Sequence, residues 1–194
     1  MEEGLLDARA WSDALKLYER LCTFVGVGAR EHDEWWLDAG AIMRLDFQDP
    51  RGWESIDPYE GEEERLEDPL FPWLGTPATP GDVERYRSMV WELPRSSVRS
   101  LIVLLGAGTS RTDLTESLNW EKYRPERERR ADVILSRFAD GTRFYTNLSW
   151  KGDRPDFYRQ SSRGYNSFSQ YDWDAGLIAV NDDEVAVLWN FLST

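Results

Sequence analysis

The chain has 194 residues, of which 41% are hydrophobic, and its ten Trp, eight Tyr and eight Phe supply enough large apolar side chains to exclude wholesale disorder. Its net charge of −13 argues against a surface that neutralises nucleic-acid phosphates, so no direct nucleic-acid binding is expected. The longest apolar run, Leu101 to Leu105, is too short to span a bilayer, and the single cysteine permits no intrachain disulfide. Because the first residues also lack a basic region followed by an apolar one, we expect one cytoplasmic domain over residues 1–194.

The negative charge is unevenly distributed along the chain. Residues 1–100 carry 22 acidic and 11 basic side chains, a net charge of −11, whereas residues 101–194 carry 14 and 12, a net charge of −2. The densest acidic run is expected to be solvated, since like charges repel one another. It consists of Glu60, Glu62, Glu63, Glu64, Glu67 and Asp68. A surface of this kind favours a basic protein partner.

The first predicted element is an amphipathic helix. Apolar residues recur at spacings near three and four over residues 5–25, with charged residues between them. Ser12 is placed to cap the main segment of this helix, and Gly26 and Gly28 would let the chain turn out of it. Cys22 has apolar neighbours and is expected to be a buried thiol.

Two less regular stretches follow. Residues 34–47 mix aromatic, β-branched and polar side chains around a turn-like Asp38-Ala39-Gly40, which we interpret as a β-hairpin. Six of the nine prolines then lie within residues 48–81. Because proline fixes φ and removes a backbone donor, this segment is predicted to be an irregular covering of the core.

The middle of the chain contains one helical and one ambiguous stretch. Residues 82–91 have helical character. In the run that follows, Ser96 or Ser97 as a cap and Gly106 as a terminator favour a helix. The Leu-Ile-Val sequence at its centre favours a buried strand instead, and the run is too short for periodicity to decide.

Two β-hairpins are predicted towards the C-terminus. The first would pair residues 132–138 with residues 142–148 across Asp140-Gly141, since glycine tolerates the positive φ of a tight turn. The second would pair residues 176–180 with residues 185–191. The sequence thus predicts an α+β fold, in which an N-terminal amphipathic helix and further short helices pack on a mainly antiparallel sheet that includes both hairpins.

A glycine-rich loop follows the apolar run 101–105. It contains Gly106, Gly108, Thr109 and Ser110, and it resembles the opening motif of the sirtuin-type NAD-binding domain. The resemblance implies a nucleotide whose phosphates lie against the backbone amides of this loop. The alternative is an ordinary loop or helix cap, because the chain after the loop favours hairpins over βαβ units and its only histidine, His32, precedes the loop.

Other residues that could carry chemistry are scattered. The sequences His32-Asp33-Glu34 and Asp182-Asp183-Glu184 are interpreted as solvated turns, because neither has a second His or a Cys at metal-ligand spacing. No Gly-x-Ser-x-Gly motif is present, and apolar neighbours do not activate Cys22. A catalytic carboxylate pair among the 36 acidic residues is left open, since sequence spacing cannot locate one. The sequence therefore favours binding over catalysis and predicts no cofactor or metal.

Two further segments mix charged and aromatic side chains. Residues 111–130 alternate basic and acidic side chains, which indicates an exposed, salt-bridged segment. Residues 154–173 combine Arg, Tyr and Trp with Gly, Ser and Asn, a composition typical of recognition loops. Besides the acidic run, the candidate partner-binding residues are aromatic: Trp73, Tyr158, Tyr165, Tyr171 and Trp173.

These observations rank three functions. The first is a non-enzymatic protein-binding module, in particular an acidic inhibitor in the style of bacterial immunity proteins that neutralises a basic toxin or nuclease. The second is a nucleotide-binding protein or enzyme that uses the loop 106–110. The third is a DNA mimic, whose acidic surface would block a DNA-binding protein. The sequence leaves the oligomeric state open.

Overall fold

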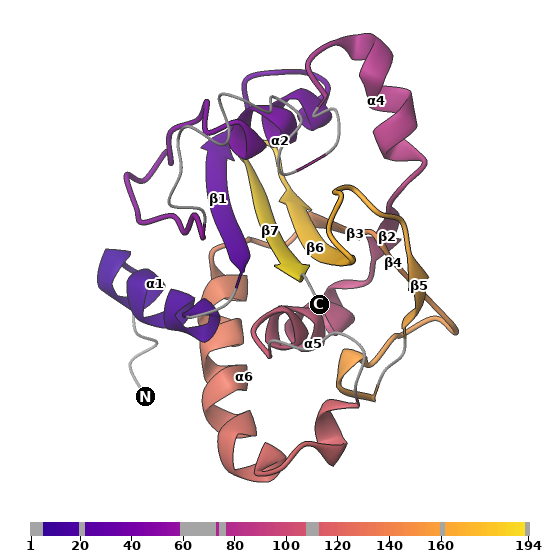
Figure 1. The fold of residues 1–194 in the computed structure, drawn as a ribbon. Coiled ribbons are helices and arrows are strands. Elements are labelled where there is room, and N and C mark those ends of the chain that lie inside the picture. Colours follow the sequence, from indigo (N-terminus) through magenta and orange to yellow (C-terminus); the bar gives the residue numbers. More distant parts are fainter. Residues whose placement is uncertain are drawn as a thin grey trace.

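The computed structural model describes residues 6–19, 22–58, 73, 77–107, 113–159 and 162–192. Its elements, shown in Figure 1, are α1 (Ala8–Leu15), η1 (Lys16–Tyr18), β1 (Thr23–Ala29), α2 (Trp35–Met43), α4 (Pro80–Arg87), β2 (Trp91–Leu93), α5 (Arg95–Leu105), η2 (Leu114–Glu116), α6 (Trp120–Ser136), β3 (Arg143–Thr146), β4 (Leu148–Trp150), η3 (Phe157–Arg159), β5 (Ser162–Tyr165), β6 (Trp173–Val180) and β7 (Glu184–Leu192). The predicted α+β class is confirmed. No helix within these ranges is long and apolar enough to cross a membrane.

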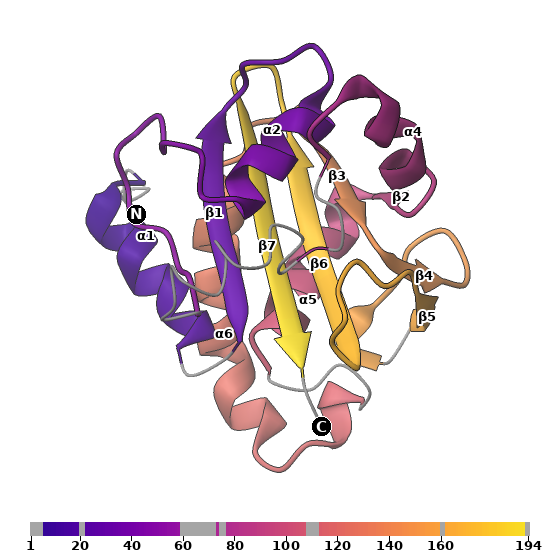
Figure 2. The ribbon, with the colours of Figure 1, turned by 45° about the horizontal axis from the view of Figure 1, so that its top comes forward.

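The centre of the molecule is a five-stranded sheet with the order β1-β7-β6-β3-β2, in which every pair is antiparallel (Figure 2). Strands β6 and β7 form the predicted C-terminal hairpin, which is therefore confirmed. The side chain of Asn181 fixes its turn, because Oδ1 accepts hydrogen bonds from the backbone amides of Asp183 and Glu184, each at 2.8 Å. Strands β4 and β5 form a separate two-stranded sheet.

Helices cover both faces of the five-stranded sheet, as Figure 1 shows. Along β7, Ala186 and Leu188 belong to a buried cluster with residues of α1, α5 and α6, whereas Val187 and Trp189 belong to a second cluster with residues of α2 and α4. This alternation follows from the two-residue period of a strand. Because both faces are buried, β6 and β7 are apolar along nearly their whole length.

The N-terminal helix is shorter than predicted. Asp7 caps it instead of Ser12, its Oδ1 accepting from the amide of Ala10 at 2.8 Å, and the chain enters β1 at Thr23. Gly26 therefore lies in a strand and not in an exit turn, and so does Gly28. A Cβ atom at Gly26 would lie 2.8 Å from Cγ2 of Ile42, so the missing side chain lets α2 approach the sheet.

The prediction of a buried thiol at position 22 was wrong as well. Cys22 is exposed, because it lies between η1 and β1 and not on the inner face of a continuing helix.

The predicted hairpin over residues 34–47 is helix α2. Periodicity failed here because the helix is buried on several sides and none of its residues is exposed. Its buried residues are Trp36, Asp38, Ala39, Gly40, Ile42 and Met43. A helix without a polar face shows no clear three-to-four spacing, and its aromatic residues imitate a strand.

The predicted hairpin across Asp140-Gly141 was wrong in its first half. Residues 132–136 are the last turns of α6, which buries Ala131 and Ile134. In its second half, residues 143–146 form strand β3, which pairs with β2 and β6, and Leu148 begins the separate strand β4. The predicted salt-bridged segment is confirmed in α6, where Glu126 pairs with both Arg129 and Arg130.

The ambiguous run before the glycine-rich loop is helix α5, which ends at Gly106. A Cβ atom there would lie 2.5 Å from Cγ of Leu17, so close packing accounts for this glycine. The sirtuin-like interpretation requires a buried strand before the loop, and a helix occupies that position. The helix predicted over residues 82–91 is confirmed as α4 up to Arg87, whereas Trp91 belongs to β2.

Candidate functional site

The predicted acidic and glycine-rich site residues fall largely outside the described ranges. This applies to the acidic run 60–68 and to residues 108–110. Of the predicted nucleotide-binding residues, only Gly106 is described, and it packs against Leu17.

The predicted aromatic residues occupy two environments. Trp73, Tyr158 and Trp173 are at most 8% exposed, so their rings contact the protein's own core. Tyr165 and Tyr171 are half-buried, and Tyr165 also donates its hydroxyl to the carbonyl of Asp172 at 2.7 Å. The described part of the chain therefore does not bring these five side chains together on one open surface.

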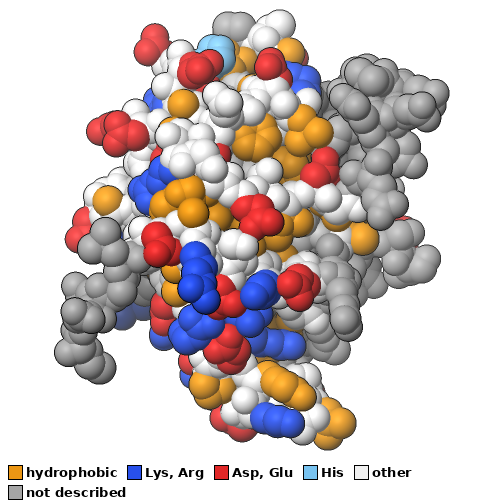
Figure 3. All heavy atoms as spheres, turned by 90° about the vertical axis from the view of Figure 1, so that its left-hand side faces the viewer, with side chains coloured by type: hydrophobic (Ala, Val, Ile, Leu, Met, Phe, Trp, Pro, Cys, Tyr) orange, Lys and Arg blue, Asp and Glu red, His pale blue; other side chains and the backbone are white. Residues whose placement is uncertain are grey.

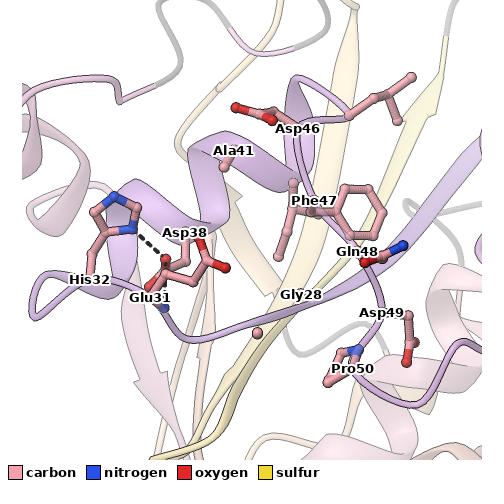
Figure 4. Close-up of a pocket in the computed structure, with 13 residues that line it drawn as sticks. Gly28, Glu31, His32, Asp38, Ala41, Asp46, Phe47, Gln48, Asp49 and Pro50 are labelled. Atoms are coloured by element: carbon pink, nitrogen blue, oxygen red, sulfur yellow. Dashed lines mark hydrogen bonds and ion pairs between the residues drawn. The ribbon is translucent and has the colours of Figure 1, made fainter.

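A cavity of about 550 Å³ lies beside α2, at the end of β1. Figure 4 shows Glu31, His32 and Asp38 on one side of it. The segment 45–50, with Phe47 and Gln48, descends along the other side. Only residues 48–50 of this segment belong to the stretch that the sequence predicted to be an irregular covering, and here they form part of the wall of a pocket.

A histidine and an aspartate form a short pair at the cavity. The Nδ1 atom of His32 lies 2.6 Å from Oδ1 of Asp38. An ionised carboxylate can only accept, so Nδ1–H donates. The imidazole is about half exposed, whereas the Asp38 side chain is only 4% exposed. The half-exposed imidazole ring therefore lies between the buried carboxylate and the solvent.

Only one oxygen of the Asp38 carboxylate has a hydrogen-bond partner in the described part of the chain. Oδ1 accepts from His32 and also from the backbone amide of Glu31, at 3.2 Å. Oδ2 is buried and has no hydrogen-bond partner within the described residues. Leaving a buried acceptor without a partner costs about 1–3 kcal/mol, and more when the group is charged. The site therefore holds an acceptor that a bound donor would satisfy.

The opposite wall is anchored by a buried ion-pair triad. The guanidinium of Arg137 donates to Asp49 at 2.8 Å and to Glu184 at 2.9 Å. It is fully buried and also lies over the rings of Trp11 and Trp53, 4.9 and 5.2 Å from their centroids. Burial lowers the pKa of Arg137, but the hydrogen bonds to Glu184 and Asp49 outweigh it, and the net pKa is raised.

The cavity lies at an acidic end of the sheet. Glu31 and Asp46 line it, Asp33 follows the lining residue His32 in the chain, and Asp182 and Asp183 lie in the adjacent β6–β7 turn. None of these five carboxylates has an ion-pair partner within the described ranges. Arg30 ties the turn to the cavity, since it donates to the carbonyls of Asn181 and Asp33 and not to a carboxylate.

The space-filling view separates two kinds of charge on one face. Figure 3 shows the histidine at the top of this face with acidic side chains near it. Lower down, basic and acidic side chains alternate, in agreement with the ion pairs of α1 and α6, such as Arg129 with Asp13 at 3.0 Å. The lower charges are matched with one another, whereas the upper ones are mainly acidic.

Asp38 is the residue that the sequence analysis missed, because it was assigned to a hairpin turn. It is the only charged residue of α2, in the sequence WWLDAGAIM. A single acid in an otherwise apolar helix is a signal in its own right, since burying an unpaired charge is costly. His32 was interpreted as part of a solvated turn, and it does lie at the surface, but paired with this buried acid.

No group of three or more His, Cys, Asp or Glu side chains in the described ranges is arranged to hold a metal ion. Comparison of the chain with protein-family models, with curated proteins and with solved structures finds no match in any of the three.

Proposed function

We propose that this protein binds a basic protein partner through the acidic end of its sheet, as an inhibitor of the immunity type that neutralises a basic toxin or nuclease. The alternative basic partner is a DNA-binding protein. In that case the protein acts as a DNA mimic, and its carboxylates take the place of DNA phosphates.

The observation that supports this proposal most directly is the imbalance of charges around the cavity. Many arginines elsewhere are already engaged: Arg129 and Arg130 pair with Glu126, Arg143 pairs with Glu92, and Arg137 is buried. Two carboxylates that line the cavity, Glu31 and Asp46, and three beside it, Asp33, Asp182 and Asp183, have no such partner among the described residues and remain available to an external cation.

The arrangement also suits fast association. A cluster of like charges at one end of a molecule creates a field that steers an oppositely charged partner and raises the association rate. Such steering weakens as salt screens it, over a Debye length of about 10 Å at 0.1 M.

The test compares two charge reversals of equal size. Asp182→Lys/Asp183→Lys changes the turn beside the cavity, whereas Glu116→Lys/Glu121→Lys changes exposed carboxylates of η2 and α6. Each protein is used to capture partners from extracts of the source cells, and a captured basic protein is then purified for binding kinetics. We expect the first variant to lose the partner and the second to keep it.

The kinetic readout is the association rate of that partner at about 50 mM and about 500 mM salt. Steering predicts a fall of about tenfold or more in wild type and a smaller fall in Asp182→Lys/Asp183→Lys. An association rate that does not depend on salt, or equal loss of the partner in both variants, would refute the proposal.

A further inference from the structure

We propose that the cavity beside α2 is a guanidinium site, which receives an arginine side chain of the partner and holds it on the carboxylate of Asp38. This inference rests on the proposed function and names the group that the acidic end recognises.

The anchor of the site is the unsatisfied oxygen of Asp38. The side chain is 96% buried and lines the cavity, and Oδ2 has no partner within the described residues. His32 and the amide of Glu31 both bond to Oδ1, so they orient the carboxylate through that oxygen and leave the buried Oδ2 without a partner among the described residues. A buried acceptor of this kind calls for a donor, and a cationic donor also neutralises the charge.

The remaining lining suits a cation with an apolar stem. Glu31 and Asp46 add negative charge at the cavity, and Ile42, Leu45 and Phe47 provide apolar surface. A volume of about 550 Å³ is large enough for a whole arginine side chain, not merely for a bare ion. The methylene groups of arginine would contact the apolar part of the lining while its head reaches the carboxylate.

Guanidinium fits this lining better than ammonium. It is planar, more weakly hydrated and carries five donors, so it loses less on leaving water and can serve two carboxylates at once. The neighbouring triad shows the same chemistry inside the protein, since Asp49, which also lines the cavity, holds the buried guanidinium of Arg137 together with Glu184.

The only histidine of the chain supplies the readout. His32 bonds directly to Asp38, and its imidazole proton resonances need no assignment because no other histidine exists. Wild-type protein is titrated with Nα-acetyl-arginine methylamide, with the lysine analogue, and with the citrulline analogue, which has the same shape without the charge. The backbone amide of Glu31, which also bonds to Asp38, is a second reporter.

We expect saturable shifts with the arginine derivative, binding at least about tenfold weaker with the lysine analogue, and no binding of the citrulline analogue. In Asp38→Asn the Kd for the arginine derivative should rise about tenfold or more. The matched control Glu121→Gln removes an exposed carboxylate of α6 and should leave the Kd unchanged.

Equal Kd values in wild type and Asp38→Asn, or equal shifts with the citrulline analogue, would overturn the assignment of Asp38. Binding of free arginine without binding of the blocked derivative would overturn a protein side chain as the source and point to a small molecule. Failure here is distinguishable from failure of the proposed function. If Asp182→Lys/Asp183→Lys loses the partner while the blocked arginine never binds, the acidic end recognises the partner without this pocket.

Discussion

Two neighbouring sites bury carboxylates to nearly the same extent and treat them differently. The side chains of Asp49 and Glu184 are each 6% exposed, and that of Asp38 is 4% exposed. In the triad, the buried guanidinium of Arg137 pairs with both acids. Asp38 instead has a half-exposed histidine on one oxygen and no partner among the described residues on the other. The chain thus satisfies the acids that hold its elements together. Among the described residues it leaves one oxygen of Asp38 without a partner, and an unsatisfied buried acceptor at a cavity is a feature that a bound ligand can explain.

Removal of Arg137 should have the largest effect. Arg137→Met leaves two buried carboxylates without their cation, and breaking a buried ion pair in this way costs about 3–5 kcal/mol. The free energy of unfolding is measured by urea denaturation. Arg143→Met is the control, because the ion pair of Arg143 with Glu92 is more than half exposed and should contribute less than about 1 kcal/mol.

The cost should come from the stranded charges and not from the lost side-chain volume. Adding Asp49→Asn and Glu184→Gln to Arg137→Met removes those charges and should recover part of the loss. A single variant as stable as wild type would show that the triad is not a stabilising anchor.

Changing the close approach of α2 to the sheet should have the next largest effect on stability. This packing positions α2, which forms one side of the cavity that Asp38 lines. In Gly26→Ala the new Cβ would lie 2.8 Å from Ile42 and 2.9 Å from Phe47, so α2 or the 45–50 segment must shift. Such overpacking costs about 1–3 kcal/mol. We expect lower stability in urea and, because Ile42 and Phe47 line the cavity, weaker binding of the arginine derivative.

Gly164→Ala is the matched control for this change. It also lies in a strand, but its Cβ would meet only Oγ of Ser149 at 3.7 Å, an ordinary contact. The expected change is within about 1 kcal/mol and can be a gain, since alanine restricts the unfolded chain. An equal loss of stability in both variants would mean that Gly26 is not required for the close packing of α2 on the sheet.

The parts of the fold that sequence predicted are those whose signal is local. The β6–β7 hairpin was predicted because two apolar runs flank a short polar turn, and Asn181 closes that turn with bonds to its near neighbours. Helix α2 was missed because it is covered on several sides, which removes the amphipathic spacing. The last turns of α6 were missed because Val133, Ile134 and Leu135 resemble a strand when they are considered without the charged helix that precedes them.

The candidate site was harder to predict because tertiary contacts create it. Asp38 and His32 are only six residues apart, but the burial of Asp38 depends on α2 docking over Gly26 and Gly28 of β1. The triad joins Arg137 to acids 88 and 47 positions away, and no spacing rule relates them. Composition predicted an acidic surface, whereas the location of an unpaired acid required the fold.

Neutralising Asp38 should affect stability less than binding. Asp38→Asn weakens the bond to His32 but also removes a buried charge with one unsatisfied oxygen, so the free energy of unfolding should change by less than about 1 kcal/mol. The contrast is Asp174→Asn. Asp174 is fully buried, and its carboxylate accepts from Phe168, Ser169, Ser167 and Asn147.

An asparagine at position 174 would turn an amide donor towards some of those donors, at a cost of about 1.5–3 kcal/mol. Urea denaturation of both variants at neutral pH measures the difference. If Asp38→Asn proved as destabilising as Asp174→Asn, Asp38 would be a structural acid like those of the triad, and the contrast between the two sites would disappear.

Removing the exposed ion pairs of α6 should have the smallest effect on the free energy of unfolding. Hydrogen bonds from Arg129 and then Arg130 hold the pKa of Glu126 at about 2, below its ordinary 4.5. A carboxyl whose pKa is lowered by folding adds stability above pH 4.5 and loses it as the pH falls towards about 2. Glu126→Gln should therefore be slightly less stable than wild type at pH 7 and equally stable near pH 2.

Because Glu126 is half exposed, about 0.5 M salt should reduce the difference in stability at pH 7. A difference that grew on acidification would reverse the sign and show that this carboxylate does not stabilise the helix through its arginines.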